Sequence, residues 1–327
     1  MTTTSTTPVL EIDGLGIRLP DDRAARPVLD GVSLTVRPGE TVGLVGESGS
    51  GKSVACRSAL GLLPPGARIS GQVRVSGRDV LSMRPKELAA LRAREVAMVF
   101  QDPRASVNPL RRVGDFLTEG LRACGAPADR AAARAVELLD AVGIRDPRGA
   151  LRRFPHQLSG GMLQRVVIAA ALAAEPALLL ADEPTTALDV TTQAEVIAIL
   201  ARLRAERGTG MLFVTHDLEL ASTICDRVYV MYAGRIVETR STDELFERPR
   251  HPYTAGLLAC TPRIEPGAPA PRPIPGRPVS LAEAPPGCSF AARCPHAVAR
   301  CTEETPELAP HGEGMAACLR AEEGITL

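Results

Sequence analysis

Short apolar runs bounded by turn residues alternate with stretches of helical spacing along most of this chain. The runs "LEIDGLGIRL", "VLDGVSLTV" and "TVGLVG" have the composition and the flanking Gly, Pro and Asp residues that are typical of strands. From Lys52 onward, apolar residues recur at helical spacing until Pro64 and Pro65 interrupt the pattern. The pattern predicts strands or hairpins at 10–19, 28–36, 41–46 and 71–80, and helices at 52–63 and 86–94.

The same alternation continues towards residue 240. "VAMVFQ" (96–101) has the pattern of a buried strand, and residues 103–157 are mostly helical, with breaks expected at Pro109, Pro127 and Pro147. Strand patterns recur at "ALLLADE", "MLFVTHD" and "RVYVMYAGRIVE", separated by helices. Strands that alternate with helices predict an α/β fold with a mainly parallel, covered sheet.

Composition divides the chain into three parts. Nine prolines fall between residues 262 and 286, which is too many for a helix or a central strand. We therefore expect one large domain over 1–260, with its helical subdomain at about 103–160, then an extended proline-rich linker over 261–287. A cysteine-rich tail follows over 288–327.

Charge and hydropathy exclude two classes of protein. The formal net charge is zero and the pI is about 7.0, so the chain lacks the basic excess of a nucleic-acid-binding protein. Its most apolar stretch is interrupted by Glu175 and Pro176, well short of the ~20 residues needed to cross a bilayer. The first residues lack the basic start and apolar run of a secretory signal. We expect a cytosolic protein unless a partner brings it to a membrane.

A phosphate-binding loop is the strongest motif. "GESGSGKS" follows a predicted strand and precedes a predicted helix, which is the context such a loop requires. Its glycines let backbone N–H groups surround phosphates, Lys52 is expected to reach the β- and γ-phosphates, and the Ser53 hydroxyl to bind Mg²⁺. One of the chain's only two lysines occupies this position, where a compact ammonium is needed. The predicted ATP-binding residues are Gly46, Glu47, Ser48, Gly49, Ser50, Gly51, Lys52 and Ser53.

Two carboxylates end a later apolar strand, "LLLADEP". Asp182 is placed to hold Mg²⁺, and Glu183 is placed to polarise the water that attacks the γ-phosphate. Alone, such a pair could be a solvated turn, but the phosphate loop favours the catalytic reading. His216 and Gln101 also end apolar strands, and strand ends in such sheets converge on one crevice. His216 is then a catalytic candidate, and Gln101 a Mg²⁺ ligand or holder of the attacking water; taken alone, each could be an ordinary surface residue.

A second glycine-opened helix start occurs in "LSGGMLQR" (158–165). Ser159, Gly160 and Gly161 would present N–H groups and the positive end of a helix dipole to an anion. The nucleotide that this chain binds is expected to have its phosphates at 46–53. The second site therefore makes sense if it closes over nucleotide held by another subunit. The alternative is an ordinary serine N-cap with glycines for packing.

In this order, the phosphate loop, Gln101, "LSGGMLQR", "LLLADEP", "TALD" and His216 resemble the ATPase subunits of ABC transporters over roughly residues 9–260. The resemblance implies a P-loop NTPase fold with a mainly parallel core sheet, an N-terminal antiparallel β subdomain, a helical signature subdomain and a cysteine-rich C-terminal extension. It further implies that Glu183 is the general base, that Ser159, Gly160 and Gly161 contact the partner's γ-phosphate, and that Asp189 lies at the dimer interface. The helical insert would receive a coupling helix from a membrane subunit.

A narrower resemblance is to the oligopeptide/dipeptide importer ATPases, which nickel importers also resemble. It rests on "FQDPRASVNPL", "DEPTTALDVTTQAEV", "RPRHPYTAGLL" and "PPGCSFAARCPHAVARC". It implies a second, homologous ATPase (or a second copy), two transmembrane permeases, an external solute-binding protein, and a location at the cytoplasmic face of the membrane. A soluble ABC ATPase acting on ribosomes or DNA is the alternative, but the chain has one cassette, no basic arm and no heptads.

The chain departs from this family near the adenine. Members usually carry an aromatic residue close to the end of the first strand, whereas this chain has none before Phe100. Leu19 occupies the expected position, with Arg18 beside it. Apolar contact or the guanidinium face would replace stacking, with a loss of about 1–3 kcal/mol of binding free energy.

Four of the eight cysteines form a separate group in the tail. Cys288, Cys294, Cys301 and Cys318 lie in a segment too small for its own core, and a reducing compartment disfavours disulfides. Their spacing matches neither common zinc pairs nor ferredoxin patterns, so a Zn²⁺ site, an iron–sulfur site and unligated thiols all remain open. The family resemblance favours a structural [4Fe–4S] cluster. Cys56, Cys124, Cys225 and Cys260 are expected to be buried thiols.

Overall fold

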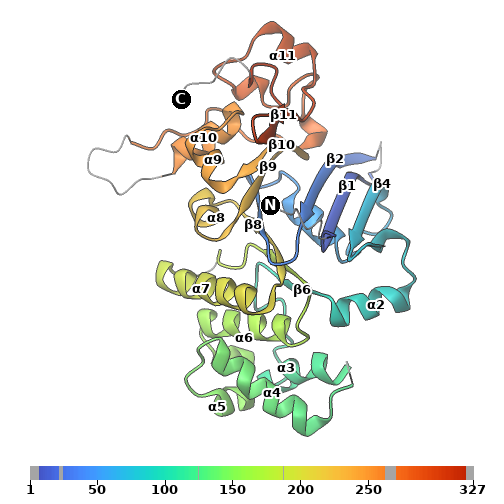
Figure 1. Ribbon diagram of the computed structural model, residues 1–327, viewed down its shortest axis with the longest axis vertical. Helices are drawn as coiled ribbons and strands as arrows, with labels where there is room; N and C mark the ends of the chain where they lie inside the picture. Colours follow the sequence, from blue (N-terminus) through green and yellow to red (C-terminus); the bar gives the residue numbers. More distant parts are fainter. Residues whose placement is uncertain (1–6, 22–24, 124, 187, 262–269, 322–327) are drawn as a thin grey trace, which may run out of the picture. The chain divides into compact units, whose positions relative to one another are not determined.

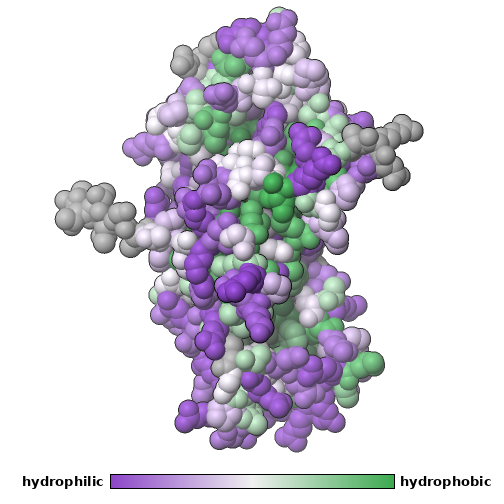
Figure 2. Space-filling view, turned by 90° about the vertical axis from the view of Figure 1, so that its right-hand side faces the viewer, coloured by the Kyte–Doolittle hydropathy of each residue, from purple (hydrophilic) through white to green (hydrophobic). Residues whose placement is uncertain are grey.

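The computed structural model describes residues 7–21, 25–123, 125–186, 188–261 and 270–321. The chain forms two compact units, which are described separately. The first unit comprises 1–9, 36–40 and 82–212, and the second comprises 10–35, 41–81 and 213–327. On the face shown in Figure 2, polar residues predominate and apolar residues form smaller patches. Among the described residues, no helix has both the length and the apolar composition needed to span a bilayer.

The first unit is built from two parallel strands and a group of helices. Strands β6 (Val96–Val99) and β7 (Leu178–Asp182) pair in parallel, and the first residues of β8 (Gly210–Thr215) continue this sheet beside β7. The helices of this unit are α2 (Pro85–Arg94), α3 (Val113–Ala123), α4 (Ala128–Ala141), α5 (Pro147–Arg152), α6 (Gly160–Leu172) and α7 (Val190–Arg207).

Helices α3 to α6 pack against one another and form a helical layer (Figure 1). In α4, the buried residues Ala131, Ala135, Leu138 and Leu139 recur at helical spacing, so one face of the helix enters the core. The breaks expected at Pro109, Pro127 and Pro147 are confirmed, since Pro109 lies in a turn before α3 and the other two lie where a new helix begins. Pro127 is the N-cap of α4 and Pro147 is the first residue of α5, so both prolines start helices, where the missing N–H costs nothing.

The second unit contains an antiparallel sheet in the order β2-β1-β4-β5, visible at the blue end of the chain in Figure 1. Its strands are β1 (Leu10–Leu19), β2 (Arg26–Val36), β4 (Arg68–Val75) and β5 (Arg78–Asp79). The predicted strands and the predicted hairpin at 71–80 are thereby confirmed. Helix α1 (Lys52–Ser58) ends earlier than residue 63, because the chain turns at Gly61, whose φ of 61° is left-handed.

A second sheet of this unit has the order β11-β12-β10-β9-β3-β8. Strands β3 and β9 pair in parallel. The neighbouring pairs β9–β10, β10–β12 and β12–β11 are each antiparallel. Its strands are β3 (Thr41–Val45), β9 (Arg227–Tyr232), β10 (Arg235–Ser241), β11 (Ala309–His311) and β12 (Gly314–Ala316), and its helices are α8 (Leu218–Ile224), α9 (Thr242–Glu247), α10 (Pro252–Cys260) and α11 (Ala299–Glu303).

The tail therefore does more than follow a linker, since β12 pairs with β10 and adds two strands to a sheet. The two units together contain an antiparallel N-terminal sheet, mostly parallel core strands and helices.

Candidate nucleotide-binding and hydrolysis site

The phosphate loop lies between β3 and α1 in the second unit. All five residues of β3 are buried, as expected of a strand covered on both faces. A side chain on Gly46 would place its Cβ 2.1 Å from the Met231 carbonyl oxygen, and a Cβ on Gly51 would lie 2.6 Å from Leu29 Cδ2. Gly51 also has a φ of 102°. Close packing therefore requires a glycine at position 46, and both close packing and the left-handed backbone require one at position 51.

Lys52 is buried inside this loop. Its Nζ donates hydrogen bonds to the carbonyl oxygens of Gly46 at 2.7 Å and Glu47 at 3.0 Å. Ser53 is half-buried in the first turn of α1, whereas Ser48 and Gly49 are exposed at the tip of the loop. The loop thus holds one ammonium group among backbone groups, which is the arrangement that a polyphosphate requires.

Support for the loop comes from the hairpin between β9 and β10, which the sequence pattern did not reveal as antiparallel. The Gly234 N–H at its turn donates to the Ser50 carbonyl oxygen at 3.0 Å, and the Asp30 N–H donates to the Gly234 carbonyl oxygen at 3.0 Å. Gly234 has a φ of 75°, and a Cβ there would lie 2.4 Å from the Val28 carbonyl oxygen. The β9–β10 turn, residues 232–234, is therefore part of the framework that shapes the phosphate loop.

Other candidates of the second unit lie at strand ends. His216 follows β8 and is exposed. Leu19, the last residue of β1, is half-buried, and Arg18 beside it is exposed.

In the first unit, the structure brings Gln101 and Glu183 together. Asp182 ends β7 and is 1% exposed, and Glu183 follows it with a φ of 49°. The Glu183 carboxylate accepts hydrogen bonds through Oε2 from Gln101 Nε2 at 3.0 Å and from Thr186 Oγ1 at 2.9 Å. The left-handed conformation is rare for a residue with a side chain and is typical of functional positions. Thr186 was missed from the sequence, although it lies three residues after Glu183, within one turn.

The signature segment starts α6 in the same unit. Ser159 is the N-cap, and its Oγ accepts a hydrogen bond from the Met162 N–H at 3.3 Å. A Cβ on Gly161 would lie 2.6 Å from Thr192 Cγ2, whereas a Cβ on Gly160 would meet no heavy atom within 4 Å. Gly161 is therefore needed for packing within the chain, but Gly160 faces open space.

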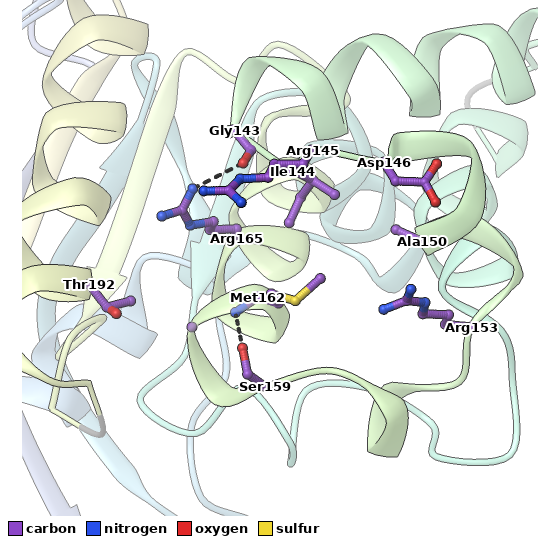
Figure 3. Close-up of a pocket in the computed structure, with 11 residues that line it drawn as sticks. Gly143, Ile144, Arg145, Asp146, Ala150, Arg153, Ser159, Met162, Arg165 and Thr192 are labelled. Carbon is purple, nitrogen blue, oxygen red and sulfur yellow. Dashed lines mark hydrogen bonds between the residues drawn. The ribbon is translucent and has the colours of Figure 1, made fainter.

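A cavity of about 420 Å³ lies beside this helix start (Figure 3). Its wall includes Ser159 and Gly161, and three arginines, Arg145, Arg153 and Arg165, also line it. The Arg165 guanidinium is fixed by donating to the Gly143 carbonyl oxygen at 3.2 Å (Figure 3). Asp146 also lines the cavity, and Arg165 pairs with Glu195, so charges of both signs lie at its wall. The arginines beside the helix N-terminus still favour an anionic ligand there.

Asp189 is the N-cap of α7. Its carboxylate accepts hydrogen bonds from the Thr192 N–H at 3.0 Å and from Thr192 Oγ1 at 2.7 Å. These bonds, the backbone one first, lower the pKa of Asp189. Because Thr192 also packs against the Gly161 position, Asp189 and the signature helix are linked through one residue.

The four cysteines of the tail line a common small cavity of about 20 Å³ in the second unit. Burial, and to a lesser degree the neighbouring thiols, raises the pKa of Cys288 and Cys294, and raises that of Cys318 to about 11. The structure therefore brings the four cysteines together at one cavity but does not by itself establish the four-thiolate metal site expected from sequence. Among the residues described, no three His, Cys, Asp or Glu side chains are arranged to hold a metal ion. Of the remaining cysteines, Cys56 and Cys225 are buried, Cys260 is half-buried, and Cys124 lies outside the described residues.

Comparison with known proteins agrees with this fold. The family description "ABC transporter" matches residues 29–186, and "Oligopeptide/dipeptide transporter, C-terminal region" matches 237–301. One similar solved structure is that of the ATP-binding cassette MJ0796, a dimer in a post-hydrolysis state bound to ADP and Pi. It matches with a TM-score of 0.65 and 27% identity, over 71% of this chain and 98% of that one. The cbiO1 protein of Clostridium perfringens gives a TM-score of 0.64 and 28% identity over 73% of this chain and 91% of that one. The fold and the phosphate loop thus define an ATPase of the ABC class.

Similar sequences identify the family within this class. The oligopeptide transport ATP-binding protein OppD of Salmonella typhimurium is 42% identical over 318 residues, which span 97% of this chain and 95% of that protein. OppD of Mycobacterium tuberculosis is 45% identical over 96% of this chain but only 52% of that protein, so this chain spans about half the length of that relative. This chain belongs to the ABC transporter ATP-binding proteins of the oligopeptide/dipeptide type.

Proposed function

We propose that this chain is the ATP-hydrolysing subunit of an ABC importer for dipeptides, oligopeptides or related solutes. The observation that carries the hydrolytic part is the Glu183 carboxylate, which Gln101 and Thr186 hold directly beyond Asp182. The assignment to peptide import is supported by the match of residues 237–301 to the C-terminal region of oligopeptide/dipeptide transporters.

In this proposal, Lys52 and the phosphate loop bind the phosphates of ATP, and Glu183 accepts a proton from the attacking water. His216 contacts the γ-phosphate. Ser53, Gln101 and Asp182 supply oxygen ligands, which are the kind that Mg²⁺ prefers, and the bound ion would neutralise developing phosphate charge. Ser159, Gly160 and Gly161 bind the γ-phosphate held by a second cassette, and Asp189 lies at that interface.

The open space at Gly160 and the arginines of the cavity beside α6 support the last step, because they leave room for a phosphate at this helix start and would attract it. The full importer would contain this cassette, a homologous second cassette, two membrane permeases and an external binding protein. The cassette would then act at the cytoplasmic face of the membrane.

Replacing Glu183 with Gln tests the hydrolytic role. Glu183→Gln should still bind ATP but lose turnover by at least the ~10²–10⁴-fold contribution of a general base. The measurement is phosphate release by purified protein, with Glu219→Gln, at an exposed position in α8, as the control. Near-normal turnover of Glu183→Gln would contradict the assignment.

We also propose that Cys288, Cys294, Cys301 and Cys318 bind a metal centre, a [4Fe–4S] cluster with a structural role or Zn²⁺. The support is that all four line one cavity, where a bound metal would further stabilise the tail. A bound cation would also favour the thiolate forms of Cys288, Cys294 and Cys318, whose pKa values burial raises. Anaerobically purified protein should be brown and contain iron; colourless protein containing zinc would exclude the cluster, and metal-free protein would exclude both.

A further inference from the structure

Glu47, the second residue of the phosphate loop, is held by two side chains from the C-terminal part of the chain. Its carboxylate forms a bidentate ion pair with Arg293, with Nη1–Oε2 and Nη2–Oε1 distances of 2.7 and 3.0 Å. Its backbone N–H donates to the Tyr253 hydroxyl oxygen at 2.8 Å. Both the side chain and the backbone of Glu47 are therefore fixed from the outside of the loop.

The Arg293 side chain is itself immobilised. It is 5% exposed, and its Nε donates to the Pro275 carbonyl oxygen at 2.9 Å. The guanidinium carbon lies 5.8 Å from the ring centroids of both Tyr232 and Phe290. The ion pair with Glu47 raises the pKa of Arg293 above its usual value, so the guanidinium stays charged. A planar fork held on several sides orients a carboxylate more strictly than a flexible ammonium would.

Tyr253 is placed with similar precision by the "HPYT" segment. His251 caps α10 by accepting the Tyr253 N–H at Nδ1, at 3.0 Å, and Pro252 occupies the first helical position. The Tyr253 ring packs against Tyr232 and Phe290, with centroid separations of 4.6 and 5.3 Å. The aromatic cluster thus aims the hydroxyl at the phosphate loop.

Backbone hydrogen bonds of the cysteine segment fix the turn that carries Arg293. Arg293 ends a short 3-10 turn between Cys288 and Cys294. The Cys288 carbonyl oxygen accepts from the Ala291 N–H at 2.9 Å, and the Cys294 N–H donates to the Ala291 carbonyl oxygen at 3.2 Å. Phe290 and Ala291 line the cavity together with the cysteines. The cysteine region therefore contacts the phosphate loop through Arg293.

We propose that Arg293 and Tyr253 are positioning residues for the phosphate loop, through which the C-terminal region sets the affinity for nucleotide. This inference rests on the proposed ATPase function. Lys52 donates to the Glu47 carbonyl oxygen, so any displacement of Glu47 alters the surroundings of the ammonium that binds phosphate. Neither Arg293 nor Tyr253 needs to touch ATP.

The test measures the Kd of a fluorescent ATP analogue and the kcat and KM for ATP, using purified full-length variants. Arg293→Gln should weaken binding about tenfold, equivalent to about 1.4 kcal/mol, with a smaller change in kcat. Arg293→Lys should restore part of the affinity, and Tyr253→Phe should cause a loss smaller than that of Arg293→Gln. Arg300→Gln is the matched control, because Arg300 lies in the same tail but pairs with Glu304 on the surface.

A double-mutant cycle separates positioning from general destabilisation. If Arg293 acts through Glu47, the variant Glu47→Gln/Arg293→Gln should bind no more weakly than Arg293→Gln, within about twofold. Additive losses, or unchanged affinity in Arg293→Gln and Tyr253→Phe, would overturn the inference. Wild-type protein that neither binds nor hydrolyses ATP would instead overturn the proposed function. Thermal unfolding of each variant identifies any that fail to fold.

Discussion

At the scale of single residues, Glu183 shows how the fold prepares a side chain for chemistry. The strand β7 delivers two consecutive acids, but Asp182 remains buried while the left-handed conformation of Glu183 turns the chain out of the strand. Gln101 and Thr186 then hold the same carboxylate oxygen. In the proposed mechanism Thr186 is a positioning residue, since it holds the proposed base, Glu183, and does not contact the substrate.

The two signature glycines give a matched pair of substitutions. Gly160→Ala adds a methyl group that meets nothing in the described structure and stands at the first position of a helix, where Ala is favoured over Gly by up to about 1 kcal/mol. Gly160→Ala should keep or raise the thermal stability of the isolated chain. It should nevertheless lower ATP turnover by at least tenfold, because the methyl group intrudes on the partner's γ-phosphate.

Gly161→Ala is the comparison, since its methyl group would press on Thr192 and lower stability as well. Thermal unfolding and phosphate release should be measured on both variants. Full activity of Gly160→Ala would mean that no phosphate approaches this helix start.

At the scale of elements, α10 links the sheet, the tail and the phosphate loop. The buried Glu238 of β10 accepts the backbone N–H groups of Arg250 and His251 at 2.7 and 2.9 Å. His251 then caps the helix with a neutral imidazole, since burial lowers its pKa to about 3. The orientation of Tyr253 depends on both contacts.

This buried histidine predicts a pH dependence of stability. Its pKa is about 6.5 unfolded and about 3 folded, so below pH 6.5 the unfolded chain binds a proton that the native state does not. The stability that neutral His251 contributes to folding is fully present above pH 6.5. It is lost as pH falls towards 3, by up to about 1.4 kcal/mol of unfolding free energy per pH unit. Burial raises the pKa of Glu238, which acts in the opposite direction at lower pH.

His251→Asn removes the titrating imidazole but keeps the helix cap, because an Asn side chain also accepts an N-cap hydrogen bond. Denaturant unfolding between pH 7 and 5 should show a shallower fall in stability for His251→Asn than for wild type. His156→Asn, at an exposed position, serves as the control. Equal slopes for wild type and His251→Asn would show that His251 is not buried in its neutral form.

At the scale of the whole molecule, local patterns predicted the elements but not their long-range pairings. The phosphate loop, the acids after β7 and the serine start of α6 follow from glycines, strand hydrophobicity and N-cap preference within a few residues. The pairing of β12 with β10 and the contact of Arg293 with Glu47 join residues far apart in sequence. Nothing in the local spacing of "GCSFAARC" reveals that its arginine, Arg293, meets a loop residue 246 positions earlier.

The central claim is that this cassette drives a peptide importer, and purification of its complex tests it most directly. Tagged Glu183→Gln should be isolated with ATP from detergent-solubilised membranes of the native host, and the bound proteins identified by mass spectrometry. We expect two polytopic permeases, a second cassette and a solute-binding protein whose ligand is a peptide or peptide-like solute. Recovery of ribosomal or DNA-repair components without any membrane protein would contradict the transport function while leaving the ATPase assignment in place.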